Sequence, residues 1–167
     1  MLNATEKTNA CLDALKSHPD SWVEYCCALH DLEANEGLSA LSEAEQYVLS
    51  AYQLDSCIQS SGLFSYFELQ TAWAAKGVQA TGVLGLTGLN QMLVRALSAM
   101  SLPSDATEAQ IAEATRRLVG ESEEFAGLLD HFEQLEDDFF YQADAPVADA
   151  IVSFAVINHD ALLRAET

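Results

Sequence analysis

Apolar residues recur at three- and four-residue intervals along most of this chain, and this period constrains its fold more than any other feature. The clearest stripe consists of Leu89, Met92, Leu93, Ala96, Leu97 and Met100. Similar stripes run from Trp22 to Leu32, from Tyr47 to Ile58 and from Phe125 to Phe139. Apolar side chains at these intervals share one face of an α-helix, whereas a half-buried strand needs strict alternation. The sequence therefore predicts an all-α protein.

Residues that start and stop helices divide the chain into short segments. Ser42-Glu43-Ala44-Glu45 and Thr107-Glu108-Ala109-Gln110 are capping boxes, in which two side chains satisfy free amides at a helix start. The helix ends that we expect are Gly37, Gly62, Gly77 and Gly120, with a break at Pro103 and a short helix and tight corner around Gly82, Gly85 and Gly88. These signals predict roughly seven to nine helices, the first within residues 1–18.

The last helix is expected to start near Asp144-Ala145-Pro146, because proline is favoured in the first turn. Its segment from Ile151 to Ile157 is apolar on every side. This pattern predicts a central helix covered all round. Because the segment is rich in β-branched residues, a buried strand is the alternative there.

Length and composition favour a single domain spanning residues 1–167. Half of the residues are hydrophobic, which is enough for a core. No apolar run approaches the ~20 residues of a membrane helix, and the N-terminus does not resemble a signal peptide. The four cysteines form no Cys-x-x-Cys pair, and no zinc site is expected. We therefore expect a cytoplasmic protein.

Charge is the feature that bears most directly on function. The chain has 26 Asp and Glu against seven Lys and Arg, a formal net charge of -19. A charge of this size disfavours binding to nucleic acid and to anionic membranes, and favours basic partners. Between Arg117 and Arg164 there are eleven acids and no cation, and between Lys16 and Lys76 there are nine acids and no cation. Local salt bridges therefore cannot neutralise these two tracts.

The segment from Glu121 to Tyr141 combines an apolar face with many acids. Glu136 falls on the apolar stripe, so we expect a kink there. The acids that we expect to face a partner are Glu121, Glu123, Glu124, Asp130, Glu133, Asp137 and Asp138, with Glu33, Glu36, Glu43 and Glu45 as a second patch.

Carboxylates on a helix can imitate the phosphates of DNA. Residues three or four apart on a helix have Cβ atoms ~5–6 Å apart, and DNA has one phosphate per roughly 3.4 Å of rise along each strand. The alternative explanation is an acidic surface that maintains solubility or suits life in high salt, which the presence of only three lysines also fits.

Catalytic motifs are weak in this sequence. Two His-Asp dipeptides, His30-Asp31 and His159-Asp160, leave a metal-dependent phosphohydrolase of the HD type as an alternative. Glu136-Asp137-Asp138 lacks the alternating oxygen ligands and the turn glycine of a calcium loop. We expect no enzymatic activity, no cofactor and no bound metal.

Two groups of motifs resemble a known family. Leu41 to Val48, followed by Ser60 to Phe67, is similar to the opening of a bacterial domain-of-unknown-function family whose named member is an acidic DNA mimic. The later segments Leu128 to Phe132 and Asp137 to Phe140 are similar to its Leu-Asp-Asp-x-Phe/Tyr segment. The resemblance covers roughly residues 40–160, and this chain departs at the turn, where Ser60-Ser61 replaces Asn and Leu63 replaces the second Gly.

The resemblance implies an all-helical fold, a homodimer and sequestration of a transcription factor by a phosphate-like surface. Together with the charge, it predicts a non-enzymatic protein that occupies the DNA-binding face of a transcriptional regulator or nucleoid protein. Direct binding to nucleic acid or to membranes is not expected. An immunity-type protein that neutralises a basic toxin remains an alternative within the same class.

Overall fold

Helices follow one another along nearly the whole chain in the computed structural model, which describes residues 3–119, 122–141 and 147–164, but not the side chains of Ser122 and Glu123. The elements are α1 (Ala4–Ala14), η1 (Pro19–Ser21), α2 (Trp22–Glu36), η2 (Leu38–Ala40), α3 (Glu43–Ser61), α4 (Leu63–Leu69), α5 (Thr71–Val83), α6 (Thr87–Ala99), α7 (Glu108–Val119), α8 (Ser122–Glu136), the π-helical turn η3 (Asp137–Tyr141), α9 (Val147–Ile157) and α10 (His159–Leu162). Nine α-helices of the described residues have seven residues or more, and no strand occurs there. The all-α class and the number of helices are confirmed.

The expected capping residues fix the ends of several helices. The Ser42 hydroxyl accepts the Glu45 N–H, and the Glu45 carboxylate accepts the Ser42 N–H. Thr107 and Gln110 make the same reciprocal pair before α7. Gly37 ends α2 with φ +86°, a conformation that glycine adopts without strain. Gly120 and Asp144-Ala145-Pro146 lie outside the described residues.

Gly77 does not end a helix, which corrects one expectation. The chain breaks instead at Gln70, between α4 and α5, and Gly77 lies inside α5. A Cβ atom at Gly77 would lie 2.8 Å from the Tyr66 hydroxyl and 3.0 Å from the Leu93 Cδ1 atom. The glycine therefore permits close packing. The expected short helix is also absent, because α5 continues to Val83, and the corner lies at Gly85, with φ +74°.

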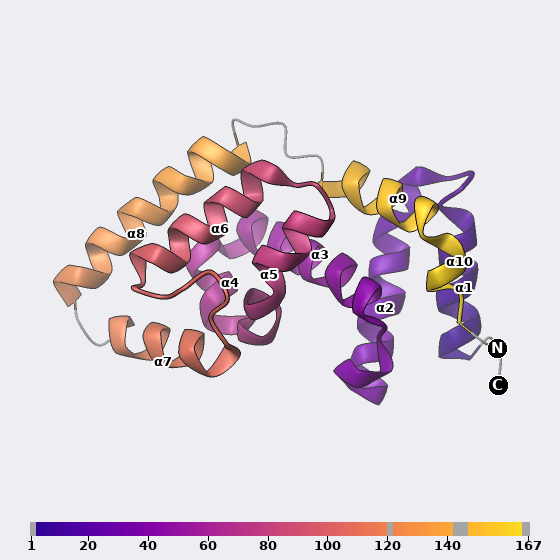
Figure 1. Cartoon of the computed structure of the whole chain (residues 1–167), viewed down its shortest axis with the longest axis horizontal. Helices are drawn as coiled ribbons and strands as arrows, with labels where there is room; N and C mark the ends of the chain where they lie inside the picture. The colour runs from indigo at the N-terminus through magenta and orange to yellow at the C-terminus, as the bar shows by residue number, and fades with distance from the viewer. Residues whose placement is uncertain (1–2, 120–121, 142–146, 165–167) are drawn as a thin grey trace.

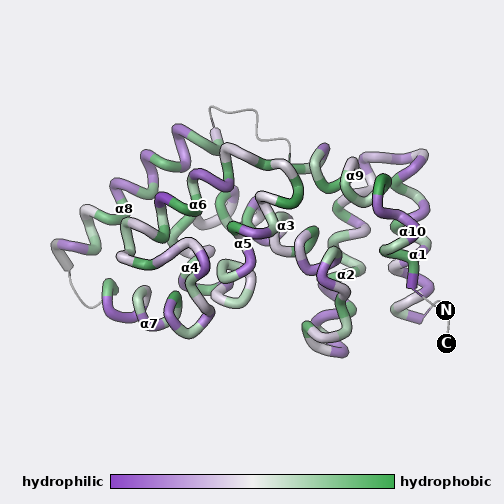
Figure 2. The backbone as a smooth tube through the Cα atoms, viewed as in Figure 1, coloured by the Kyte–Doolittle hydropathy of each residue, from purple (hydrophilic) through white to green (hydrophobic). Residues whose placement is uncertain are grey.

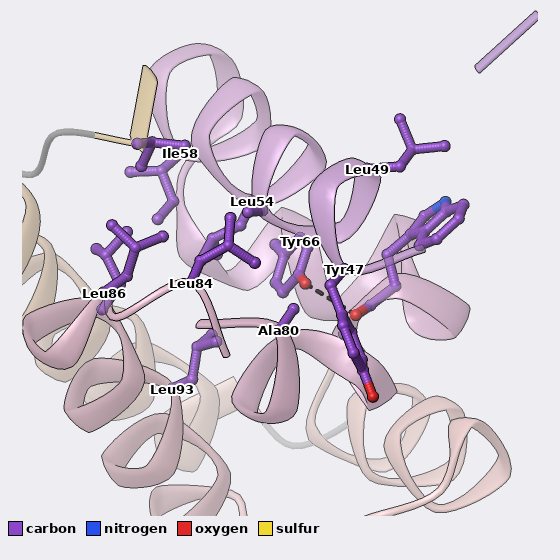
Figure 3. Close-up of a cluster of buried hydrophobic side chains, with 14 of the residues drawn as sticks. Tyr47, Leu49, Leu54, Ile58, Tyr66, Ala80, Leu84, Leu86 and Leu93 are labelled. Carbon is purple, nitrogen blue, oxygen red and sulfur yellow. Dashed lines mark hydrogen bonds between the residues drawn. The ribbon is translucent and has the colours of Figure 1, made fainter. Parts of the chain in front are cut away.

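One continuous core runs through the described residues and joins the helices into a single domain. Its buried side chains extend from Leu12 to Leu162. At its centre, Leu54 and Ile58 of α3 face Ala80 of α5 and Leu93 of α6 (Figure 3). The Tyr66 hydroxyl donates to the Trp73 carbonyl at 2.9 Å, which satisfies a polar group inside this core.

The helices form an elongated body with α3 and α5 in the middle (Figure 1). At one end, α1 packs against α2 and α10, and α9 contacts α2 and α3. At the other end, α8 packs against α4, α6 and α7. This arrangement places α8 along an outer edge of the molecule, where one side of it is open to a partner.

The final long helix is not central, contrary to the expectation for Ile151 to Ile157. Ile151 and Ala155 are buried, but Ile157 is 82% exposed and Val156 is 40% exposed. The segment is helical, so the strand alternative is wrong. An all-round apolar sequence therefore leaves apolar side chains in solvent here. Among the described residues, no helix combines the length and the apolar character needed to cross a bilayer.

Candidate acidic binding surface

Helix α8 presents acids on one side and core residues on the other. Phe132 and Leu135 are buried, while Asp130 and Glu133 are exposed. Hydrophilic and hydrophobic residues alternate along α8 with the period of a helix (Figure 2). Because residues three apart are neighbours on a helix surface, Asp130 and Glu133 lie on the same side.

The acids continue into the π-helical turn that follows. Asp137 and Asp138 are both exposed, and the Gln134 side-chain amide donates to Asp138 at 2.9 Å. We call Asp130, Glu133, Asp137 and Asp138 the acidic strip. Its four carboxylates lie in a stretch of sequence without a cation, so a basic partner is the expected source of neutralising charge.

Glu136 lies between these acids but faces inward. Its side chain is buried, and its carboxylate accepts the Leu63 backbone N–H at 2.7 Å. Burial raises the pKa of Glu136, and the charges of Glu133 and Asp137 raise it further, while the Leu63 N–H opposes the shift. The helix changes from α to π directly after this residue, at the position where we expected a kink.

The three acids at the start of α8 are described to different extents. Glu121 lies outside the described residues, and only the backbone of Glu123 is described. Glu124 is exposed and lines a surface cavity of about 240 Å³ with Leu118 and His131. Their place in a partner-binding surface stays a prediction.

Arg95 of α6 contacts the π-helical turn η3. Its guanidinium lies over the Phe139 ring, 4.9 Å from the ring centroid. Such cation–π contacts stabilise by ~0.5–1 kcal/mol at exposed sites. A cation of α6 therefore contacts η3, the turn that also carries Asp137 and Asp138.

The second patch is reduced to three acids, because Glu45 is not available to a partner. Its side chain is 1% exposed, and its two oxygens accept from Arg164 Nε at 2.9 Å and Arg164 Nη2 at 2.6 Å. This corrects the prediction that Glu45 faces a partner. Glu36 and Glu43 are exposed, and Glu33 is half-buried. Glu43 also accepts the Tyr47 hydroxyl at 2.7 Å.

The two acidic patches lie on separate parts of the molecule. Helix α8 follows one outer edge, whereas the corner between α2 and α3 lies on the opposite side of the body (Figure 1). The strip is the larger continuous group of exposed acids among the predicted residues.

Comparison with protein families gives a match over most of the chain. The model of the family described as DMP19-like protein matches residues 39–159. The chain belongs to the DMP19-like family. This is the DNA-mimic family that the sequence motifs resembled, and it is a non-catalytic family. Comparisons with curated proteins and with solved structures gave no match.

The DMP19-like region contains the strip and excludes the N-terminal pair of helices. It begins within η2 and ends at the start of α10, so α1, α2, Glu33 and Glu36 precede it. Arg164 follows it, yet pairs with Glu45 inside it. The Asn9 side-chain amide of α1 donates to the Arg164 backbone carbonyl at 3.0 Å, and its side-chain oxygen accepts the Arg164 backbone N–H at 3.0 Å. The C-terminal flank is therefore held onto the family region by partly buried polar contacts, and Asn9 joins α1 to this flank.

The two His-Asp pairs of this DMP19-like chain make separate structural contacts. The His159 ring is buried and contacts Asp13 at 2.7 Å and Asp160 at 3.2 Å. His30 is exposed on α2, and Asp31 pairs with Lys7 at 2.6 Å. Within the described residues, no group of three or more His, Cys, Asp or Glu side chains is arranged to hold a metal ion. The part of the chain that the structure describes gives the hydrolase alternative no supporting geometry.

The contacts of two residues that matter for the surface, Arg164 and Glu136, were not found from the sequence. Arg164 gave no signal, because its partners are more than a hundred residues away along the chain. Glu136 did give one, since an acid on an apolar stripe must be satisfied or must distort the helix. Its partner Leu63 could not be inferred from the local pattern.

Proposed function

We propose that this protein is a non-enzymatic DNA mimic that occupies the DNA-binding face of a basic transcriptional regulator or nucleoid protein. The observation that carries the proposal is the acidic strip, which is exposed at the edge of the molecule and has no cation in its own segment. Membership of the DMP19-like family supports it. The role of each strip carboxylate is to pair with a Lys or Arg that otherwise contacts a phosphate.

Helix geometry gives the strip its likeness to a nucleic acid backbone. Carboxylates three and four residues apart repeat every ~5–6 Å between Cβ atoms, on the scale of neighbouring phosphates on one strand. The partner would release counterions on binding DNA, but fewer on binding this surface, so its affinity for the mimic should fall less steeply with salt. Competition would then be strongest at moderate and high ionic strength.

We also propose that the protein acts in the cytoplasm, and that it forms a homodimer, which the family resemblance implies. Two copies would present two strips, which suits a dimeric regulator with two DNA-binding faces. Sedimentation equilibrium over a range of concentrations tests this part. A monomer at all concentrations would contradict it without affecting the role of the strip.

The test of function is capture followed by titration. Tagged protein is incubated with a native lysate, and the bound proteins are identified and purified. The proposal expects a basic DNA-binding protein, whereas a secreted or injected toxin would indicate the immunity-type alternative. Binding is then measured for the wild type and for a strip variant with Asp130→Lys, Glu133→Lys and Asp137→Lys.

A matched control separates local charge from total charge. Reversing the exposed Asp20, Glu24 and Asp149 changes the net charge equally, from -19 to -13, because each reversal adds two charges. Like charges placed opposite one another cost several kcal/mol, so the strip variant should lose about a hundredfold in affinity, and the control less than about fivefold. Equal losses would mean that only overall charge matters, and the proposal would be wrong.

A further inference from the structure

The acidic strip crosses a change of helix type, and this change fixes how its acids are oriented. Asp130 and Glu133 belong to α8, whereas Asp137 and Asp138 belong to the π-helical turn η3. A π-helical turn places more residues per turn than an α-helix, and such turns are rare and frequently found at functional sites. The relative directions of the two halves of the strip therefore depend on what holds the turn.

Glu136 holds the junction from the inside. It is the last residue of α8, and its carboxylate accepts the N–H of Leu63, a residue 73 positions away and the first of α4. The first amides of a helix have no partner within the helix, and a negative charge there is favourable. A single side chain thus satisfies its own buried charge and ties the junction to α4.

The backbone before α4 is shaped to admit this carboxylate. Gly62 has φ +85°, and a Cβ atom at that position would lie 3.3 Å from Glu136 Oε1. A residue with a side chain would be strained by the backbone conformation and crowded by the carboxylate. The backbone conformation of Gly62 and its lack of a side chain therefore both allow the contact between Glu136 and Leu63.

The far side of the turn is held by two aromatic residues. The Phe139 ring lies under the Arg95 guanidinium of α6, and the Tyr141 hydroxyl donates to the Ile58 carbonyl of α3 at 3.4 Å. With Glu136 on α4, the turn is attached to three helices. Asp137 and Asp138 remain exposed on the turn.

We infer that Glu136 is a positioning residue for partner binding, which sets the direction of the strip without contacting the partner itself. This inference rests on the proposed function. If it is right, the geometry of the Glu136 side chain matters more for partner binding than its charge. Removing that charge changes the net charge only from -19 to -18, whereas releasing the junction lets two of the four strip acids reorient.

Three substitutions separate geometry from charge. Glu136→Gln removes the charge but keeps a carbonyl oxygen at the same reach for the Leu63 N–H. Glu136→Asp keeps the charge but shortens the side chain by one methylene. Glu136→Ala removes both. If position is what matters, the glutamine variant behaves like the wild type and the other two do not.

Two measurements apply to each variant. The first is hydrogen–deuterium exchange of residues 124–141 in the protein alone, which reports local opening. The second is titration with a purified histone-like nucleoid protein at two salt concentrations. The wild type and Glu136→Gln should show slow exchange and equal affinity. Glu136→Asp and Glu136→Ala should exchange faster and bind at least about tenfold more weakly, a loss of about 1.4 kcal/mol.

The opposite ranking of the variants would contradict the inference. If Glu136→Asp binds like the wild type while Glu136→Gln binds weakly, Glu136 acts as a charge. If Glu136→Asp exchanges faster but binds normally, the junction does not govern the strip. If the wild-type protein binds no DNA-binding protein, the proposed function fails, and the inference about binding falls with it. In that case the exchange data still test whether the contact between Glu136 and Leu63 holds the junction. Unchanged exchange in Glu136→Asp would show that it does not.

Discussion

Replacing Arg164 with alanine should destabilise the protein by about 3 kcal/mol, because the change leaves a buried carboxylate without its cation. Glu45 is 1% exposed, and Arg164 donates to both of its oxygens, at 2.9 and 2.6 Å. Removing one partner of a buried ion pair costs ~3–5 kcal/mol. The Ser42 N–H and hydroxyl still donate to Glu45 after the change, at 2.7 and 2.8 Å. These contacts place the expected loss at the low end of the range.

Urea and thermal denaturation followed by circular dichroism measure this loss. For a chain of this length, 1 kcal/mol corresponds to roughly 2–4 °C in Tm, so Tm should fall by about 6–12 °C. Adding Glu45→Gln to Arg164→Ala should recover part of the loss, because the buried group is then neutral. Lys7→Ala is the control, since it breaks the exposed pair with Asp31, and it should leave Tm nearly unchanged.

A small effect would refute this reasoning. If Arg164→Ala costs less than about 1 kcal/mol, or no more than Lys7→Ala, burial does not decide the strength of the pair. The contacts of Arg164 with α1 and α3, and its hydrogen bond to the Ala40 carbonyl at 2.9 Å, would then contribute little to stability.

Three further predictions concern packing, exposure and pH. Gly77→Ala should lower the free energy of unfolding, measured by urea denaturation, by about 1–3 kcal/mol, because the new Cβ would lie 2.8 Å from the Tyr66 hydroxyl. Gly82→Ala is the control and should not destabilise the protein, because no atom would lie nearer than 3.6 Å to its Cβ. Ile157→Ser should change the unfolding free energy by less than about 0.5 kcal/mol, since Ile157 is 82% exposed; a larger loss would indicate that this residue is covered. Burial raises the folded-state pKa of Glu136 above its unfolded value, so its stabilising contribution is full below about pH 4.3 and is lost as the pH rises through the folded value. Between pH 4 and 7, the wild type should therefore lose stability relative to Glu136→Gln, and parallel pH curves would contradict the shift.

The sequence was sufficient for most of the fold because its helices carry their own boundaries. The capping boxes at Ser42 and Thr107 are local patterns, and local patterns determine where helices start. The prediction that Gly77 ends a helix was wrong because a glycine inside a helix has the same local sequence pattern as one at its end. Only the neighbouring Tyr66 and Leu93 reveal its role in close packing.

The binding surface was less accessible from sequence because exposure depends on tertiary structure. Asp130 and Glu133 could be assigned to the outer side of α8 from the apolar stripe alone. Glu45 could not, since its burial depends on Arg164, far away along the chain. Likewise, the apolar segment before Ile157 resembles a central helix, and only the packing of α9 shows that it lies at the surface.

The central claim is that the acidic strip competes with DNA for a basic protein. The most direct test is fluorescence anisotropy of a labelled duplex bound to the protein captured from the lysate. Unlabelled wild-type protein should release the duplex in a dose-dependent way, and the Asp130→Lys, Glu133→Lys, Asp137→Lys variant should not. If the wild type binds this protein while the duplex stays bound, or if the variant releases DNA equally well, the strip is not a DNA mimic.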